Sequence, residues 1–213
     1  MRSRKHAENL DDEILLASQI LASGGVVAVP TDTTYGLAAD AFNDAAVERV
    51  FRVKGRPAGA PLPLLLAAAE EMSECVAEVP EHAWRLAELF WPGPLTLVLR
   101  KAERVSDVVS GGGDTVALRV PGHEVPRRIV SALRRPITGT SANRSGGQAA
   151  ITADEVRRAF GDELDFIVVS TVLPDGLAST VLDLSEQVPR IVRSGAVTPR
   201  EIEKAIGCDV TVD

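Results

Sequence analysis

The chain has very little cysteine and histidine. Its 213 residues include two cysteines, Cys75 and Cys208, and three histidines, and none of them shows the spacing of a zinc site or a Cys-x-x-Cys pair. The sequence therefore predicts two ordinary thiols, no disulfide framework and no metal site made from protein side chains. Without a signal peptide or paired cysteines, the expected setting is a reducing cytoplasm.

Long apolar runs and an excess of positive charge are also missing. No apolar run approaches the roughly 20 residues that a membrane-spanning helix needs, so we expect no membrane contact. The net charge of −7 and the pI near 5.1 argue against broad, nonspecific binding to nucleic acids. A local basic cleft is compatible with both values.

The sequence does have the composition of an ordinary globular protein, with 45% hydrophobic and 25% charged residues and no linker-like segment that would divide it. We therefore expect one α/β domain over residues 1–213, with a mixed, twisted sheet of parallel and antiparallel strands and flanking helices. Helical spacing and capping residues indicate helices over 11–22, 43–53, 67–76, 81–90, 125–133, 152–160 and from 198 onward. Short apolar runs indicate strands over 26–29, 62–66, 95–99, 115–120, 137–138, 166–170, 179–184 and 190–193.

A polar segment follows the first apolar strand. It contains Thr31, Asp32, Thr33 and Tyr35, whose side chains could bind a small polar ligand in a loop at the strand end. Two alternatives remain open here, because Asp32 could instead cap a turn and Tyr35 could belong to the core.

Two cations, Lys54 and Arg56, come one helix later, and Pro57 prevents that helix from continuing. Arginine binds phosphate or carboxylate through a planar fork of N–H groups, and lysine acts as a mobile point charge. The alternative is a solvated helix end, where cations are favourable beside the helix dipole. The proline and the buried strand that follows favour a fixed loop.

A second polar patch runs from Ser141 to Gly147. Its hydroxyl and amide side chains and its glycines allow a ligand to approach the backbone, whose N–H groups can then bind phosphate oxygens. The same composition is also typical of a plain surface turn, so that alternative stays open. It is not a P-loop, because that motif occurs nowhere in the chain. Further polar groups stand at strand ends, namely Arg119, Arg193 and the pair Ser179-Thr180. A cation such as Arg119 in an apolar strand needs a carboxylate or a ligand as its partner.

Taken in order, these motifs resemble the YrdC-like family. The matching segments are Pro30-Thr31-Asp32-Thr33-Thr34-Tyr35-Gly36-Leu37, Lys54-x-Arg56-Pro57, Arg119-Val120-Pro121, Ser141-x-Asn143-x-Ser145-Gly146, Ser179-Thr180-Val181-Leu182-Asp183 and Ile191-Val192-Arg193-Ser194-Gly195. The likeness spans about residues 17–206. It implies an open, twisted α/β fold around a large, basic concave cleft, in the short, single-domain form of the family.

The resemblance implies a threonylcarbamoyl-AMP synthase. Such an enzyme converts L-threonine, bicarbonate and ATP, accompanied by Mg²⁺, into threonylcarbamoyl-adenylate and pyrophosphate. A partner transferase would then pass the threonylcarbamoyl group to the adenosine next to the anticodon of certain tRNAs, and direct contact with tRNA is compatible with this role. Carried over by position, the residues on the ATP phosphates would be Lys54, Arg56, Ser141 and Asn143, with Thr115 and Arg193 also on the nucleotide side. The threonine would be held by Thr33, Arg119, Ser179 and the backbone at Gly139.

Two positions depart from the family pattern. Leu65 stands where some members have a histidine near the threonine, and Ala178 where an acidic residue or proline is more common. The resemblance also leaves two other functions open: a non-catalytic paralogue that binds RNA or ribosomes, and a relative that forms a carbamoyl-adenylate. No protein nucleophile is evident, and the proposed route needs none.

Overall fold

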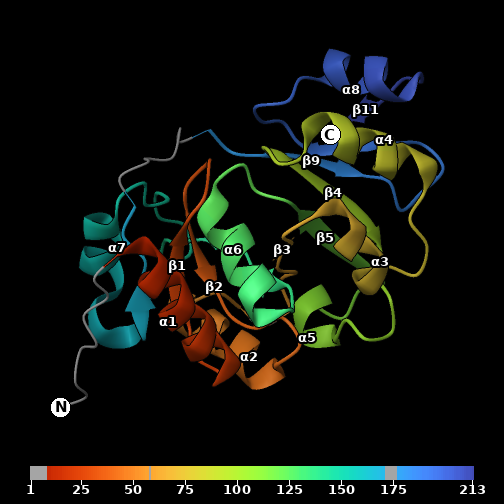
Figure 1. Cartoon of the computed structure of the whole chain (residues 1–213). Coiled ribbons are helices and arrows are strands. Elements are labelled where there is room, and N and C mark those ends of the chain that lie inside the picture. Colours follow the sequence, from red (N-terminus) through yellow and green to blue (C-terminus); the bar gives the residue numbers. More distant parts are fainter. Residues whose placement is uncertain (1–8, 58, 171–176) are drawn as a thin grey trace.

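The structure is a computed structural model that describes residues 9–57, 59–170 and 177–213. Its strands form two sheets flanked by helices (Figure 1). The smaller sheet has the order β7-β2-β1-β8 and consists of β1 (Val27–Pro30), β2 (Tyr35–Ala38), β7 (Thr140–Ser141) and β8 (Phe166–Ile167). The larger sheet has the order β11-β10-β9-β4-β5-β3-β6 and consists of β3 (Leu64–Leu65), β4 (Leu95–Arg100), β5 (Thr115–Arg119), β6 (Ile137–Thr138), β9 (Thr180–Asp183), β10 (Arg190–Arg193) and β11 (Thr211–Val212).

Both sheets mix parallel and antiparallel pairs, as expected. In the smaller sheet β1 is antiparallel to β2 and parallel to β8. In the larger sheet β4 is antiparallel to β5 and parallel to β9. The expectation of a single sheet is wrong, because the chain leaves the larger sheet after β6 and enters the smaller one at β7.

The two sheets meet at Thr138 and Gly139. Thr138 ends β6, and its hydroxyl donates to the carbonyl of Leu37 in β2 and accepts the N–H of Ala39, the residue directly after β2. Gly139 is the one residue between β6 and β7, and its N–H donates to the carbonyl of Pro63 at 2.8 Å. The junction therefore holds the edges of both sheets in a fixed relation.

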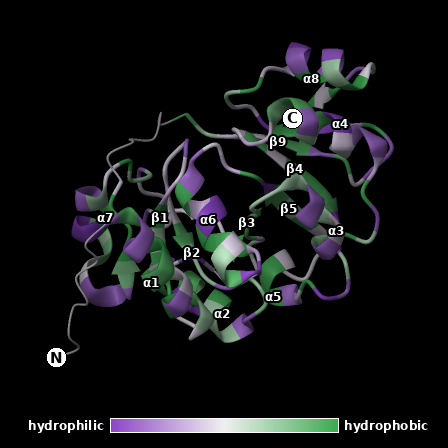
Figure 2. Cartoon of the chain, in the orientation of Figure 1, coloured by the Kyte–Doolittle hydropathy of each residue, from purple (hydrophilic) through white to green (hydrophobic). Residues whose placement is uncertain are grey.

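The helices cover the sheets and shield two apolar clusters. They are α1 (Leu10–Ala22), α2 (Asp44–Lys54), α3 (Met72–Cys75), α4 (Glu81–Phe90), α5 (Asp107–Ser110), α6 (Glu124–Leu133), α7 (Ala153–Phe160) and α8 (Pro199–Ile206). In the smaller cluster α1 and α6 pack on β1 through side chains such as Leu21, Ile129 and Val29. Figure 2 shows hydrophobic residues concentrated on the inner strands and hydrophilic ones on outward helix turns such as those of α7. No helix in the described part of the chain is long and apolar enough to cross a membrane.

Most expected helices are confirmed, because their start signals act locally. The side chain of Asn43 accepts the N–H of Ala46 at the start of α2. Thr152 and Thr198 each form a complete capping box, with Glu155 and Glu201 respectively. These caps satisfy backbone donors that the first helical turn leaves unpaired.

Several expected elements differ from the structure. The expected helix over 67–76 is a 3-10 turn, Ala69–Glu71, followed by the short α3, and the strands expected over 62–66 and 166–170 shrink to two residues each. The expected loop after β1 contains a strand, β2, and Tyr35 lies in the core with only 1% of its surface exposed. Of the two alternatives for Tyr35, the core position is therefore the one observed.

Candidate active site

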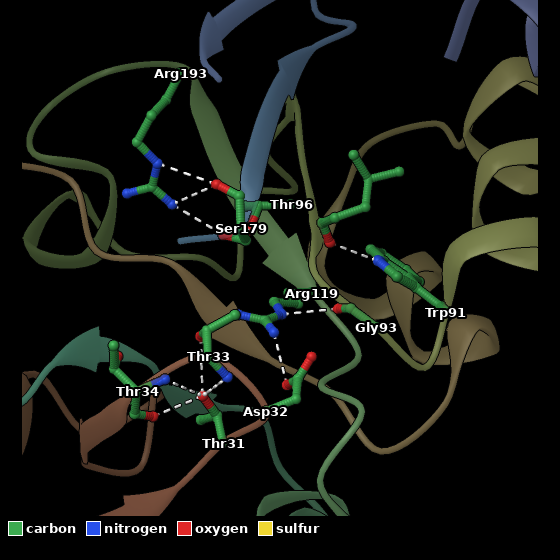
Figure 3. Close-up of polar contacts among 11 residues, drawn as sticks. Thr31, Asp32, Thr33, Thr34, Trp91, Gly93, Thr96, Arg119, Ser179 and Arg193 are labelled. Carbon is green, nitrogen blue, oxygen red and sulfur yellow. Dashed lines mark hydrogen bonds and ion pairs between the residues drawn. The ribbon is translucent and has the colours of Figure 1, made fainter. Parts of the chain in front are cut away.

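The first part of the site is a tight turn between β1 and β2. The Thr31 hydroxyl donates to the carbonyl of Thr34 at 2.7 Å and accepts the N–H groups of Thr33 and Thr34, each at 3.2 Å. It also lies 3.1 Å from the Thr33 hydroxyl. These bonds fix the backbone of the turn, so Asp32 and Thr33 are held in place beside the end of β5 (Figure 3).

Arg119, the last residue of β5, connects this turn to the larger sheet. Its Nη2 lies 2.6 Å from the Asp32 carboxylate, Nη1 donates to the Thr33 hydroxyl at 3.1 Å, and Nε donates to the Gly93 carbonyl at 2.9 Å (Figure 3). Burial lowers the pKa of the Arg119 guanidinium; the Asp32 carboxylate opposes this shift, and the charge of Arg193 adds to it. The partner that the sequence required for Arg119 is therefore a carboxylate of the protein itself.

The second part of the site joins β9 and β10. Arg193 donates through Nε and Nη2 to the carbonyl of Ser179, at 3.1 and 2.9 Å, and through Nη2 to the Ser179 hydroxyl at 2.9 Å. The Ser179 hydroxyl also lies 2.9 Å from the hydroxyl of Thr96 on β4. All of these partners are neutral, so they do not offset the positive charge of Arg193. That charge remains to attract a ligand.

The third part of the site is the Ser141–Gly147 loop, which is tied to the end of α2 by Lys54. The buried Nζ atom of Lys54 donates to the carbonyl of Ser141 and lies 3.1 Å from the carbonyl and 3.0 Å from the Oδ1 atom of Asn143. The Lys54 carbonyl in turn accepts the N–H of Ser145 at 2.9 Å. An ammonium group has three donors, and here all three face oxygens of the loop.

The loop is closed further by its own side chains. The Ser141 hydroxyl donates to Oδ1 of Asn143 at 2.6 Å, and Nδ2 of Asn143 donates to the carbonyls of Arg144 and Gly147, each at 2.8 Å. The segment is therefore an ordered loop and not a plain surface turn.

Arg56 is held more loosely than Lys54. Its Nη1 lies 3.4 Å from the Thr140 hydroxyl and its Nη2 lies 3.2 Å from the Pro61 carbonyl. Both contacts are at the long end of the range for N–H···O bonds, and they use two of five donors. Of the two cations Lys54 and Arg56, Arg56 is thus the one whose side chain has N–H donors left for a ligand.

The remaining expected residues, Thr115 and Gly139, lie on the two neighbouring elements. Alternation along β5 places Thr115 on the same face as Arg119. Between them, half-buried Ala117 pairs with half-buried Val98 of β4, so an apolar strip separates the two polar residues. Gly139 lies at the junction between the sheets, one residue from Thr140, which contacts Arg56.

Leu65 occupies the space beside Gly139. A Cβ atom at Gly139 would lie 2.5 Å from the Leu65 Cγ, and Leu65 itself is buried in the cluster between α1 and α6. Where some members of the family have a histidine, this chain thus has an apolar side chain that fills the gap against the backbone.

Two site residues, Thr96 and Thr140, were not among those expected from the sequence. Neither had a recognisable motif, because a threonine in a strand is ordinary. Asp32 was expected either to bind a small polar ligand or to cap a turn, and its ion pair with Arg119 was not predicted. Among the described residues, no group of three or more His, Cys, Asp or Glu side chains is arranged to hold a metal ion.

A pH series tests the burial of Lys54. Burial lowers the pKa of its ammonium group from 10.5 to about 8, and the charge of Arg56 acts in the same direction. Between these two pH values the unfolded chain keeps a proton that the folded chain has lost, so the free energy of unfolding should increase by about 3 kcal/mol as the pH rises through this range. Urea unfolding of the wild type and of Lys54→Met from pH 7.5 to 10.5 should show this rise only in the wild type. Parallel curves would contradict the burial.

A second series tests the contact between Gly139 and Leu65. Gly139→Ala should destabilise the fold by about 1–3 kcal/mol, because its new methyl group would overlap Leu65. Leu65→Ala alone should cost about 2–5 kcal/mol through the cavity that it leaves. In the double variant the methyl group enters that cavity, so the loss should be clearly smaller than the sum of the two. Additive losses in urea unfolding would show that the contact is absent.

Comparison of the sequence and the fold with known proteins identifies the family of this chain. A family model named for Sua5, YciO and YrdC and described as telomere recombination matches residues 19–195. The chain is 43% identical over 195 residues to a threonylcarbamoyl-AMP synthase of Pyrococcus abyssi and 36% identical over 198 residues to one of Bacillus subtilis, covering 92% of this chain and 57% of each relative. A crystal structure of P. abyssi Sua5 complexed with L-threonine has a TM-score of 0.91 and 40% identity, covering 98% of this chain and 61% of that one.

The chain thus spans less than two thirds of the length of these relatives. Within that span the matched model includes every segment on which the resemblance was based, from Pro30 to Gly195, and the mixed α/β fold agrees as well. The chain belongs to the Sua5/YciO/YrdC family.

Proposed function

We propose that this protein is a threonylcarbamoyl-AMP synthase, which makes threonylcarbamoyl-adenylate and pyrophosphate from L-threonine, bicarbonate and ATP. The observation that carries the proposal is an imbalance of charge. Lys54, Arg56, Arg119 and Arg193 supply four cations, and Asp32 is the one carboxylate among the described residues that pairs with any of them. Such a site suits substrates that bring several negative charges at once.

The reaction needs this excess of positive charge. Bicarbonate and the amine of threonine first give a carbamate and water, and a carbamate oxygen then attacks the α-phosphorus of ATP, from which pyrophosphate leaves. Two anions must approach each other, so fixed cations offset their repulsion, and positioning supplies most of the rate. Mg²⁺ would accompany the ATP phosphates, as it usually does in phosphoryl-transfer sites.

The contacts support a division of the site between the two substrates. Arg56, Arg193 and the Ser141–Gly147 loop would bind the phosphates, with Lys54 and Asn143 holding that loop in shape. Thr115 and the apolar strip of Val98 and Ala117 would face the nucleoside. Threonine would bind at Thr33, Arg119, Ser179 and the backbone of Gly139; one solved relative, P. abyssi Sua5, is complexed with L-threonine.

The product would serve a partner transferase that modifies tRNA next to the anticodon. The net charge of −7 gives little support to the alternative of an RNA-binding paralogue. Since the named relatives are threonylcarbamoyl-AMP synthases, the carbamoyl-adenylate alternative is also the weaker one.

Pyrophosphate release is the direct test of this function. We expect release from ATP and Mg²⁺ that requires both L-threonine and bicarbonate, because the carbamate is the attacking group. Release that ignores threonine but responds to carbamoyl phosphate would replace this proposal with the carbamoyl-adenylate alternative. RNA binding without any release would favour the non-catalytic paralogue.

A pair of variants on α2 and the loop after it tests the phosphate assignment. Arg56→Ala should weaken ATP binding roughly 10- to 100-fold, as expected for the loss of charge-assisted hydrogen bonds. The matched control is Arg52→Ala, since Arg52 lies four residues earlier, about one helical turn, and its side chain pairs with Glu48 at 3.9 Å. Calorimetric titration with ATP should show the loss in the first variant alone. Equal affinities in two folded variants would remove Arg56 from the site.

A further inference from the structure

The ion pair with Arg119 involves only one of the two carboxylate oxygens of Asp32. Its Oδ1 atom makes the 2.6 Å contact with Arg119, and its side chain remains 21% exposed. Its Oδ2 atom faces Gly122, where a Cβ atom would lie only 3.1 Å away. Because Gly122 is exposed and has no side chain, this second oxygen is reachable from outside the pair.

Arg119 likewise has donors left over. A guanidinium carries five N–H groups, of which one on Nε donates to Gly93 and one on Nη1 donates to Thr33. Nη2 is 2.6 Å from the Asp32 carboxylate, but both of these facing atoms are buried without a hydrogen-bond partner among the described residues. At least one N–H therefore remains on each of the two terminal nitrogens. Such a pair of donors can bind a carboxylate of a ligand in the bidentate manner that arginine favours.

A simple carboxylic acid would nevertheless fit poorly here. Its carboxylate on Arg119 would stand next to the Asp32 carboxylate on the same guanidinium, and the two negative charges would repel each other. An α-amino acid avoids this repulsion, because its ammonium group stands one carbon away from its carboxylate. The ion pair in the protein and the zwitterion of the ligand then form four alternating charges.

We propose that Asp32 binds the ammonium group of the amino-acid substrate while Arg119 binds its carboxylate. This inference rests on the proposed function and adds to it the group that selects an α-amino acid over a hydroxy acid. Asp32 then touches the nitrogen that becomes the carbamate, and the hydroxyl network of Thr31 and Thr33 holds it there.

The test uses the full chain and two probes, L-threonine and (2S,3R)-2,3-dihydroxybutyrate, in which a hydroxyl replaces the ammonium group. Both are titrated calorimetrically with α,β-methylene-ATP present, so that no turnover occurs. The wild type should bind threonine roughly 10- to 100-fold more tightly than the dihydroxy acid. Asp32→Asn should lose most of this preference, by weakening threonine binding and leaving the dihydroxy acid within about threefold.

Two further variants guard against trivial explanations. Gly122→Ala keeps the charge of Asp32 but crowds its Oδ2 atom, and should also reduce the preference for threonine. Asp114→Asn removes a carboxylate that is 77% exposed and pairs with Arg100, and should behave as the wild type does. Binding of the ATP analogue by every variant reports an intact fold and an intact nucleotide site.

The possible outcomes distinguish a failure of this inference from a failure of the proposed function on which it rests. If the wild type binds neither probe, both the proposed function and the inference are wrong. If the wild type prefers threonine and Asp32→Asn keeps that preference, the inference is wrong and the function stands. If Asp32→Asn does not fold, the same preference retained in Gly122→Ala overturns the inference, and its loss there supports it.

Discussion

The site depends on the way in which the chain passes from one sheet to the other. Gly139 is the single residue between β6 and β7, and Leu65 fills the space that a side chain there would need. On one side of the junction are β3 and β5, which carry Arg119 toward the turn after β1. On the other side is β7, which leads into the loop that Lys54 holds. A shift at this crossing would change the spacing between the two groups of cations.

Two different kinds of bonding hold these groups. The loop around Lys54 is closed by hydrogen bonds between a buried ammonium group and neutral oxygens, so dipoles stabilise the charge without neutralising it. At Arg119 a carboxylate supplies the balance. The first arrangement leaves an uncompensated positive charge next to the loop, and the second creates a local pair of opposite charges. The chemistry of the two halves therefore differs even though both rest on cations.

The sequence was sufficient to predict the elements with strong local signals. The helices capped by Asn43, Thr152 and Thr198 begin where expected, and β10 has the predicted bounds. The short strands β7 and β11 were missed, since two residues contain no periodicity, and their pairing depends on distant partners. The split into two sheets was missed for the same reason, because nothing local at Gly139 indicates a change of sheet.

The residues of the candidate site also divide into those that local motifs predict and those that depend on contacts between distant segments. Motifs were enough to select Lys54, Arg56, Ser141 and Asn143, and the structure brings Lys54, Ser141 and Asn143 into direct contact. The partner of Arg119 could not be chosen from the sequence, because a carboxylate and a ligand satisfy a buried cation equally well. Only the folded chain places Asp32, from the turn after β1, against the end of β5.

The contrast between the site and the rest of the molecule has a consequence for which anions can reach it. The four cations and one carboxylate of the site sum to +3, so a chain of net charge −7 carries −10 elsewhere. At physiological salt, charges act over a Debye length of about 8 Å. A polyanion that extends beyond this distance would also interact with the remaining charge of the chain, which sums to −10. We therefore expect the net charge to oppose the binding of long polyanions more than that of small anions.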